Sequence, residues 1–212
     1  MDLENALEKY KAYFTQKIET YGAVPEGVDY NGFEAQEIRF EQLTKVIDPS
    51  TAFSIIDYGC GYGAMFNFLL KKNWQFTYYG FDMIEKMAAA GKEANKGFTN
   101  AHFFHSENDL VVADYLTAGS IFNNKFEANH DEWQDMILAT LQRMNGLCRK
   151  GFSFNMLTKY SDEDRMSRRP DLFFGDPLYF FDHCKRNFSR DVTLLHDYVL
   201  YDFTILVRKD KG

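Results

Sequence analysis

The sequence has few cysteines, and their arrangement would not build a covalent or metal framework. Cys60, Cys148 and Cys184 are an odd number at unrelated spacings, with no CxxC pair among them. The pattern therefore predicts neither a disulfide scaffold nor a zinc site, and we expect no bound metal ion. Three unpaired cysteines fit a reducing compartment, so we expect a cytoplasmic protein.

Long apolar runs and an excess of positive charge are also absent. No stretch approaches the roughly 18 apolar residues of a membrane span, and the first residues show no secretory pattern. Acidic residues outnumber basic ones, 31 to 24. Because nucleic-acid recognition normally requires a basic face, we expect no nucleic-acid partner. Because no apolar run is long enough for a span, we also expect no membrane. A hydrophobic fraction of 45% in 212 residues predicts a globular domain with a full core.

The most informative stretch is a short apolar run, residues 53–56, that leads into a glycine-rich turn and an apolar helical pattern. This order of strand, turn and helix is typical of the ligand-binding corner of a doubly wound α/β sheet. Glycines let the backbone pass close to a ligand, and a helix N-terminus offers free N–H groups. The turn residues that we expect at a ligand are Asp57, Gly59, Cys60, Gly61 and Gly63.

Two ligand-binding patterns fit this turn. Gly59, Gly61 and Ala64 satisfy the dinucleotide pattern G-x-G-x-x-G/A, which would put a pyrophosphate on the helix N-terminus. The same turn also matches acidic-x-Gly-x-Gly-x-Gly, and this match resembles motif I of class I S-adenosylmethionine-dependent methyltransferases. The resemblance implies that Asp57 orders the loop and the ligand's amino group, while the glycines make room for the methionine part and the ribose. A nicotinamide-dependent oxidoreductase is the alternative that the first pattern allows.

A second acidic residue follows the next predicted strand. This strand covers residues 76–81 and is followed by Asp82 and Met83. An acid at this position binds a ribose in dinucleotide-binding folds, because a carboxylate can accept hydrogen bonds from both hydroxyls. The resemblance implies the same role for Asp82 and puts Met83 against the adenine. The alternative role for Asp82 is to cap the helix predicted over residues 84–96.

Two further contacts with the ligand are expected after the third and fourth strands. The third strand is predicted over residues 101–105, and the resemblance implies that Glu107 or Asn108 bonds the adenine amino group. The fourth strand is predicted within residues 114–118. The resemblance puts the end of this strand, with Gly119, beside the sulfonium and the incoming nucleophile.

The N-terminal part of the chain shows helical periodicity. Apolar residues recur at three- and four-residue steps over residues 3–21, with Asp2 as the expected N-cap, and a second helix is predicted over residues 33–47. The first helix either packs on the domain or forms a lid or a dimer surface. Arg39 on the second helix either pairs with a ligand carboxylate or is an ordinary solvated arginine.

The C-terminal half completes an alternating α/β pattern. In order, it predicts a helix over 133–149, a strand over 152–157, a polar loop over 158–176, a helix over 178–186, and strands over 192–195 and 200–208. The final hairpin matches the antiparallel seventh strand of the class I methyltransferases. We therefore predict a doubly wound, mostly parallel seven-stranded α/β sheet with an antiparallel C-terminal hairpin strand. Residues 49–212 would form this Rossmann-like domain, and residues 1–48 a helical extension packed on it.

The resemblance implies in-line transfer of a methyl group from S-adenosylmethionine, which leaves S-adenosylhomocysteine. A hydroxyl or protonated amine acceptor needs a general base, and His196 and Tyr160 are the expected catalytic residues because their loops should open toward the binding edge. The sequence lacks the Asp/Asn-Pro-Pro-Tyr/Phe and Pro-Cys patterns of nucleic-acid methyltransferases. We therefore expect a small-molecule acceptor, such as a sugar or natural-product intermediate, methylated on oxygen or nitrogen. A non-catalytic S-adenosylmethionine-binding scaffold is the other alternative.

Overall fold

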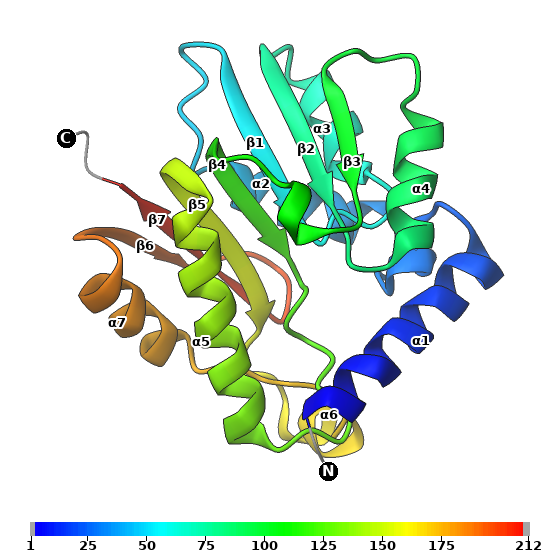
Figure 1. Ribbon diagram of the computed structural model, residues 1–212. Helices are drawn as coiled ribbons and strands as arrows, with labels where there is room; N and C mark the ends of the chain where they lie inside the picture. Colours follow the sequence, from blue (N-terminus) through cyan, green and yellow to red (C-terminus); the bar gives the residue numbers. More distant parts are fainter. Residues whose placement is uncertain (1–2, 210–212) are drawn as a thin grey trace.

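Seven strands form one sheet in the order β3-β2-β1-β4-β5-β7-β6 in the computed structural model, which describes residues 3–209 (Figure 1). They are β1 (Phe53–Tyr58), β2 (Phe76–Phe81), β3 (Ala101–Phe104), β4 (Ala113–Gly119), β5 (Cys148–Leu157), β6 (Asp191–Leu195) and β7 (Asp202–Arg208). The first five strands are parallel, whereas β7 is antiparallel to both β5 and β6. The predicted fold class, including the antiparallel C-terminal strand, is confirmed.

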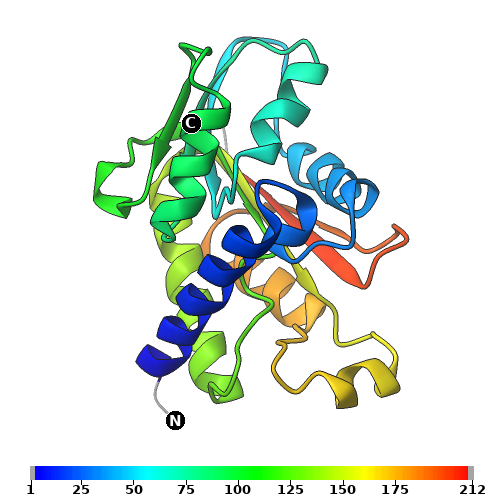
Figure 2. The ribbon, with the colours of Figure 1, turned by 90° about the vertical axis from the view of Figure 1, so that its right-hand side faces the viewer.

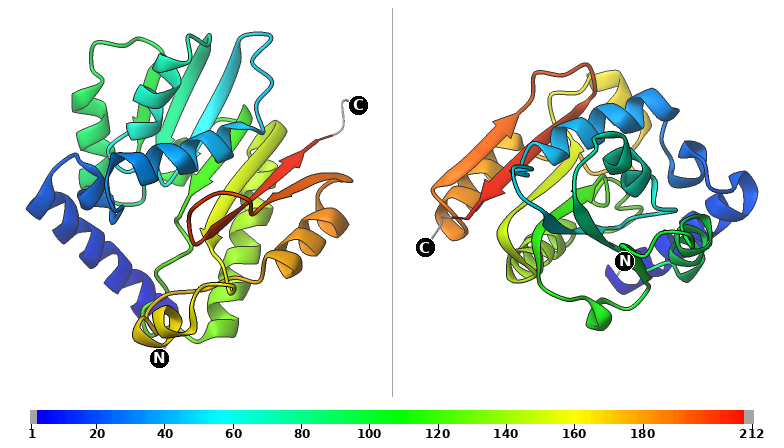
Figure 3. Two further views of the ribbon diagram at one scale, coloured as in Figure 1. Left: turned by 180° about the vertical axis from the view of Figure 1, so that it is seen from behind. Right: turned by 90° about the horizontal axis from the view of Figure 1, so that it is seen from above.

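Helices cover both faces of this sheet (Figures 1 and 3). They are α1 (Leu3–Tyr21), α2 (Phe33–Thr44), α3 (Ala64–Lys71), α4 (Glu85–Ala94), α5 (His130–Gly146), α6 (Glu163–Arg168) and α7 (Pro177–Asn187), with 3-10 turns η1 (Pro25–Val28) and η2 (Glu107–Asp109). The bounds of α1 and β2 are those predicted. Asp2, the predicted N-cap of α1, lies outside the described residues. Within residues 3–209, no helix has both the length and the apolarity to cross a bilayer.

The continuous apolar run of β1 follows from its central position. Ile55 packs into the core beneath α2 and α3, and Ile56 packs into the core beneath α5 and α7. Both side chains are fully buried. A strand covered on both faces has no solvent-facing positions, and its sequence therefore loses the alternation typical of a half-exposed strand.

The predicted boundary between α5 and β5 is wrong. The predicted helix over 133–149 ends at Gly146, and the strand predicted over 152–157 already begins at Cys148, so Gly151 lies inside β5. There it faces Arg208 of β7, and a Cβ at this position would come within 2.5 Å of the Val207 carbonyl oxygen. The glycine is needed for the close approach of two strands, a contact that local periodicity cannot reveal.

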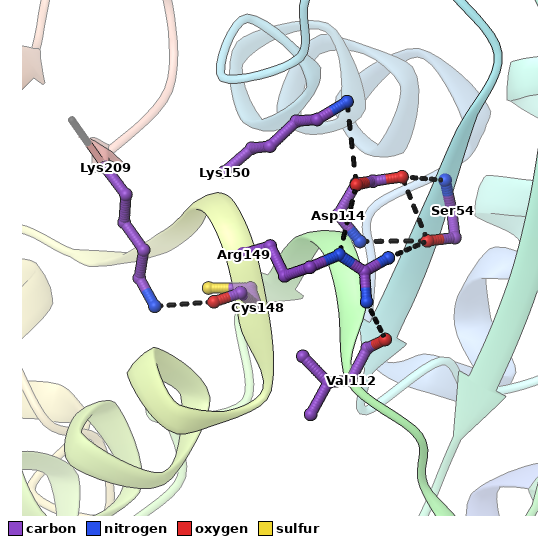
Figure 4. A network of polar contacts seen from close by, with 7 residues as sticks. All are labelled: Ser54, Val112, Asp114, Cys148, Arg149, Lys150 and Lys209. Atoms are coloured by element: carbon purple, nitrogen blue, oxygen red, sulfur yellow. Dashed lines mark hydrogen bonds and ion pairs between the residues drawn. The ribbon is translucent and has the colours of Figure 1, made fainter. Parts of the chain in front are cut away.

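A polar network joins the starts of β1, β4 and β5 (Figure 4). The Asp114 carboxylate accepts from the Ser54 amide at 2.9 Å and lies 3.4 Å from the Arg149 Nε and 3.5 Å from the Lys150 Nζ. Arg149 also donates to the Val112 carbonyl at 2.7 Å. The charged groups at this amino-terminal edge are therefore engaged in holding strands together.

Helix α1 lies at the opposite, carboxyl-terminal edge. Figure 2 shows it in front of the strands, on the outside of the molecule. Its residues Leu7, Tyr10 and Phe14 face a cavity at this edge. An ion pair of 2.8 Å between Lys17 and Asp29 ties α1 to the loop after η1. The N-terminal helix therefore covers the edge where an α/β sheet binds its ligands.

Candidate functional site

The cavity opens where the strand order reverses, between β1 and β4. In open α/β sheets this switch point is the usual ligand site, because the loops after the two strands diverge to opposite faces. The end of β1 and the turn after it, residues 57–62, line the cavity together with the ends of β2 and β4. The η1 segment and residues of α1, α2, α3, α4 and α5 complete its walls.

The turn after β1 has a backbone that needs its three glycines. Gly59, Gly61 and Gly63 have φ values of 83°, 53° and 84°, a left-handed region that residues with a Cβ rarely adopt. A Cβ on Gly61 would also lie 2.7 Å from the Val28 side chain, and one on Gly59 would overlap Ile121. The glycine pattern noted in the sequence is thus required by both conformation and space.

Asp82 holds this turn in place. Its Oδ2 accepts a hydrogen bond from the Gly61 amide at 2.8 Å, and its Oδ1 accepts from the Ile84 amide at 2.9 Å, just before α4. The side chain is 8% exposed and lines the cavity. Because each carboxylate oxygen has a second lone pair, Asp82 can still accept hydrogen bonds from ligand hydroxyls. The capping role and the ligand role are compatible.

Asp57 is the second buried carboxylate of the cavity. Its Oδ2 accepts a hydrogen bond from the Tyr78 hydroxyl at 2.6 Å. Burial raises the pKa of Asp57 to about 7 and that of Asp82 to about 6. Within residues 3–209, neither carboxylate forms an ion pair with a lysine or arginine. A ligand that brings positive charge or hydroxyl donors would therefore satisfy this part of the cavity.

Three more of the residues that the sequence singled out line the cavity, namely Cys60, Met83 and Gly119. Cys60 lines it, and its amide donates to the Phe81 carbonyl at 2.9 Å. Burial raises the pKa of its thiol well above the usual range, so the sulfur is protonated near neutral pH. Met83 lines the cavity with 43% of its surface exposed, and Gly119 lines it at the end of β4.

At the β4 side of the cavity, Tyr30 enters from the loop after η1. Its hydroxyl lies 3.3 Å from where a Cβ of Gly119 would be. Ser120 follows in the left-handed conformation, with a φ of 59°. The fully buried Asn155 fixes this residue, because its Oδ1 accepts from the Ser120 amide at 2.8 Å and its Nδ2 donates to the Ser120 Oγ at 3.2 Å.

Sequence reasoning did not single out three polar residues that line the cavity. They are Tyr10 on α1, Tyr30, and Gln36 on α2, whose Oε1 accepts from the Tyr62 hydroxyl at 3.0 Å. Gln36 is 4% exposed although it is polar. Gln36 lies nearly one helical turn from Arg39, but this spacing does not show that Gln36 faces inward. Tyr10 was not recognised because a tyrosine that faces a cavity has the same helical periodicity as a tyrosine in the core.

Four predicted contacts lie outside the cavity lining. One is Gly63, which faces the Phe103 ring, 2.8 Å from where a Cβ of this glycine would be. Arg39 forms an ion pair of 2.5 Å with Asp202 and lies behind the Tyr30 ring, 5.0 Å from its centre. Glu107 accepts from the Tyr58 hydroxyl at 2.8 Å, next to the cavity. Asn108 is exposed to solvent.

The two predicted catalytic residues lie together, but away from the cavity. The rings of Tyr160 and His196 are 5.9 Å apart, both residues are exposed, and neither lines the cavity. The loop between β5 and α7 that carries Tyr160 also contains the short helix α6. Across residues 3–209 no group of three His, Cys, Asp or Glu side chains could hold a metal ion.

Comparisons with known proteins agree with this geometry. No protein-family model matches the chain. A Mycobacterium tuberculosis (strain ATCC 25618 / H37Rv) protein named "Putative methyltransferase Rv1506c" is 44% identical over 165 residues, 78% of this chain and 98% of that protein. The N-methyltransferase NodS of Bradyrhizobium japonicum WM9, solved with S-adenosyl-l-homocysteine, has a TM-score of 0.63 at 13% identity, over 95% of this chain and 98% of that one. Magnesium protoporphyrin IX methyltransferase of Synechocystis PCC 6803, solved with bound SAM, has a TM-score of 0.53 at 14% identity, over 75% and 71%. At these identities the two structures show a shared fold.

Proposed function

The chain belongs to the class I S-adenosylmethionine-dependent methyltransferases, and we propose that it methylates an oxygen or nitrogen of a small molecule. The observation that carries this proposal is the meeting of Asp57, the glycine turn and Asp82 at one cavity. S-adenosylmethionine brings an ammonium, a sulfonium and two ribose hydroxyls. These are the charges and donors that two buried carboxylates without ion-pair partners require.

Each group of this site has a proposed role toward the cofactor. The ammonium of the methionine part lies near Asp57, and the glycine turn passes under that part and the ribose. Asp82 accepts from the ribose hydroxyls while it holds the Gly61 amide. Met83 covers one face of the adenine. Glu107 and Asn108 are the proposed partners of the adenine amino group, with Glu107 acting from its hydrogen bond to Tyr58.

The cover of the cavity supports a small acceptor. Helix α1 and the η1 segment extend over the carboxyl edge of the sheet. A macromolecule would have to displace them to reach the glycine turn at the ends of the strands. The lining also has many aromatic rings, including Tyr10, Phe14, Tyr30, Phe40 and Phe122. A small acceptor with an apolar or aromatic part suits such a lining. His196 and Tyr160 stay predictions for the general base, in a position that would require movement of their loops.

Transfer by this site would depend mainly on positioning. The acceptor attacks the methyl carbon in line with the bond to sulfur, and a well-held pair of reactants reaches effective molarities of about 10⁵ M or more. The protein residues that we assign bind and orient the two molecules. Exclusion of water by α1 would protect the sulfonium from side reactions.

The experiment that tests this function is calorimetric titration of the full chain with S-adenosylmethionine, S-adenosylhomocysteine and NADH. Binding of the first two alone supports the proposal. Transfer of a tritiated methyl group is then measured with pooled small metabolites, and separately with RNA, DNA and protein. Binding of NADH alone would identify a nicotinamide-binding protein. Cofactor binding without transfer to any pool would favour a non-catalytic scaffold.

A further inference from the structure

The cavity has two polar sides that come from different strands. Asp57, the glycine turn and Asp82 lie at the ends of β1 and β2 and form the proposed cofactor side. The opposite side, at the end of β4, presents Tyr30 and Ser120. This inference rests on the proposed function, in which the cofactor fills the side formed by Asp57, the glycine turn and Asp82. The methyl group is then transferred toward the side that presents Tyr30 and Ser120.

The Tyr30 hydroxyl is held at the end of β4 from two directions. On one side is the Ser120 side chain, whose hydrogen bond with Tyr30 lowers the pKa of that tyrosine, and the Ser120 backbone is fixed in turn by the two hydrogen bonds with Asn155. On the other side the Arg39 guanidinium lies against the Tyr30 ring. Arg39 is itself anchored by Asp202, which is fully buried, and by the Ala35 carbonyl at 3.0 Å. Such support fixes the direction in which the hydroxyl points.

The direction of the Ser120 hydrogen bond indicates what the Tyr30 oxygen can do. The Asn155 amide oxygen accepts from a backbone N–H, so the Asn155 nitrogen must be the group facing the Ser120 Oγ. The Ser120 hydroxyl keeps its own proton, which it can donate to the Tyr30 oxygen, and this direction agrees with the lowering effect of Ser120 on the pKa of Tyr30. The Tyr30 oxygen keeps a second lone pair, which can accept a hydrogen bond from a molecule in the cavity.

We propose that the Tyr30 hydroxyl binds the nucleophilic O–H or N–H group of the acceptor and aligns it with the methyl group. In the transfer, the acceptor lone pair forms the new bond to the methyl carbon. The carbon–sulfur bond breaks and its electron pair stays on sulfur, while the acceptor proton passes to the general base that such an acceptor needs. Burial raises the pKa of Tyr30, against the opposite effects of Arg39 and Ser120. Tyr30 therefore keeps its own proton and orients the acceptor without acting as the base.

Sinefungin allows a test that does not require the acceptor. This analogue of S-adenosylmethionine carries a protonated amine where the sulfonium methyl would be, whereas S-adenosylhomocysteine has no group there. Calorimetry should show that Tyr30→Phe lowers sinefungin affinity about tenfold, as for a lost hydrogen bond to a charged group. The affinity for S-adenosylhomocysteine should change less than twofold.

The control is Tyr13→Phe, which removes a hydroxyl bonded to Asp29 outside the cavity and should leave both affinities unchanged. An unchanged sinefungin affinity in folded Tyr30→Phe would overturn the proposal. If circular dichroism shows that this variant does not fold, Ser120→Gly decides, because it keeps the left-handed backbone and removes the partner of Tyr30. Its sinefungin affinity should fall, and an unchanged value would again overturn the role of Tyr30. Failure of the unmodified chain to bind either analogue would instead contradict the proposed function.

Discussion

Asp82 and Gly61 are 21 residues apart in the chain, yet the Asp82 Oδ2 accepts a hydrogen bond of 2.8 Å from the Gly61 amide. The bond connects the end of β2 to the turn after β1. This hydrogen bond orients the Asp82 carboxylate at the cavity and holds the Gly61 backbone at its φ of 53°. One residue thus shapes the binding turn and offers its remaining lone pairs to a ligand.

Asp82→Ala should weaken S-adenosylmethionine binding by about 1.5–3 kcal/mol, the usual effect of losing a hydrogen bond to a charged group. Asp82→Asn keeps one oxygen for a backbone amide and should bind more tightly than the alanine variant. Titration calorimetry of both variants measures the difference. An unchanged affinity in Asp82→Ala would remove the ribose role.

Gly61→Val should block the cofactor while the fold persists, because the new side chain meets Val28 and requires a left-handed backbone. The left-handed conformation costs about 1–2 kcal/mol for a residue with a Cβ. Gly97→Val is the matched control, since a Cβ there meets nothing within 4 Å. Binding is measured by calorimetry and folding by thermal melting. Normal binding by Gly61→Val would show that the ligand site lies elsewhere.

Asp57→Asn should stabilise the unliganded protein at alkaline pH. The folded pKa of Asp57 is about 7, against 3.8 for the reference carboxyl, so between these values the folded state holds more protons. This group therefore lowers the free energy of unfolding as pH rises through that window. Removing it should raise that free energy by about 1–3 kcal/mol at pH 8 and by less at pH 5.

The same substitution should weaken S-adenosylmethionine binding, because the amide cannot neutralise the ligand's ammonium. Urea unfolding at the two pH values gives the stabilities, with the exposed Asp109→Asn as the comparison. A gain in stability that is the same at both pH values would mean that folding does not raise the pKa of Asp57.

Arg39→Met should destabilise the fold by about 3–5 kcal/mol, because it leaves a buried carboxylate without its partner. Asp202 is fully buried and accepts from Arg39 at 2.5 Å. The double variant Arg39→Met/Asp202→Leu should regain most of the loss, since it removes both charges. Denaturant unfolding of the unmodified chain, of each single variant and of the double variant gives a double-mutant cycle, which measures the interaction energy of the pair. A double variant no more stable than Arg39→Met would argue against an interaction between the two side chains.

The sequence alone determined the elements whose causes are local. The bounds of β2 and α1 follow from apolar periodicity, and the turn after β1 follows from backbone sterics that only glycine satisfies at three positions. The order of strands and helices then predicted the sheet and the acid at the end of β2. Each of these features depends on neighbours along the chain.

Only the tertiary structure decided which side chains meet across long separations. Arg39 and Asp202 are 163 residues apart. Because Arg39 pairs with Asp202, it supports the Tyr30 ring and does not contact the ligand as predicted. Tyr30 itself comes from a loop without any periodic pattern, and His196 and Tyr160 lie together outside the cavity. Such contacts arise from how helices and loops pack on the sheet, and packing geometry has no signature in the spacing of residues along the chain.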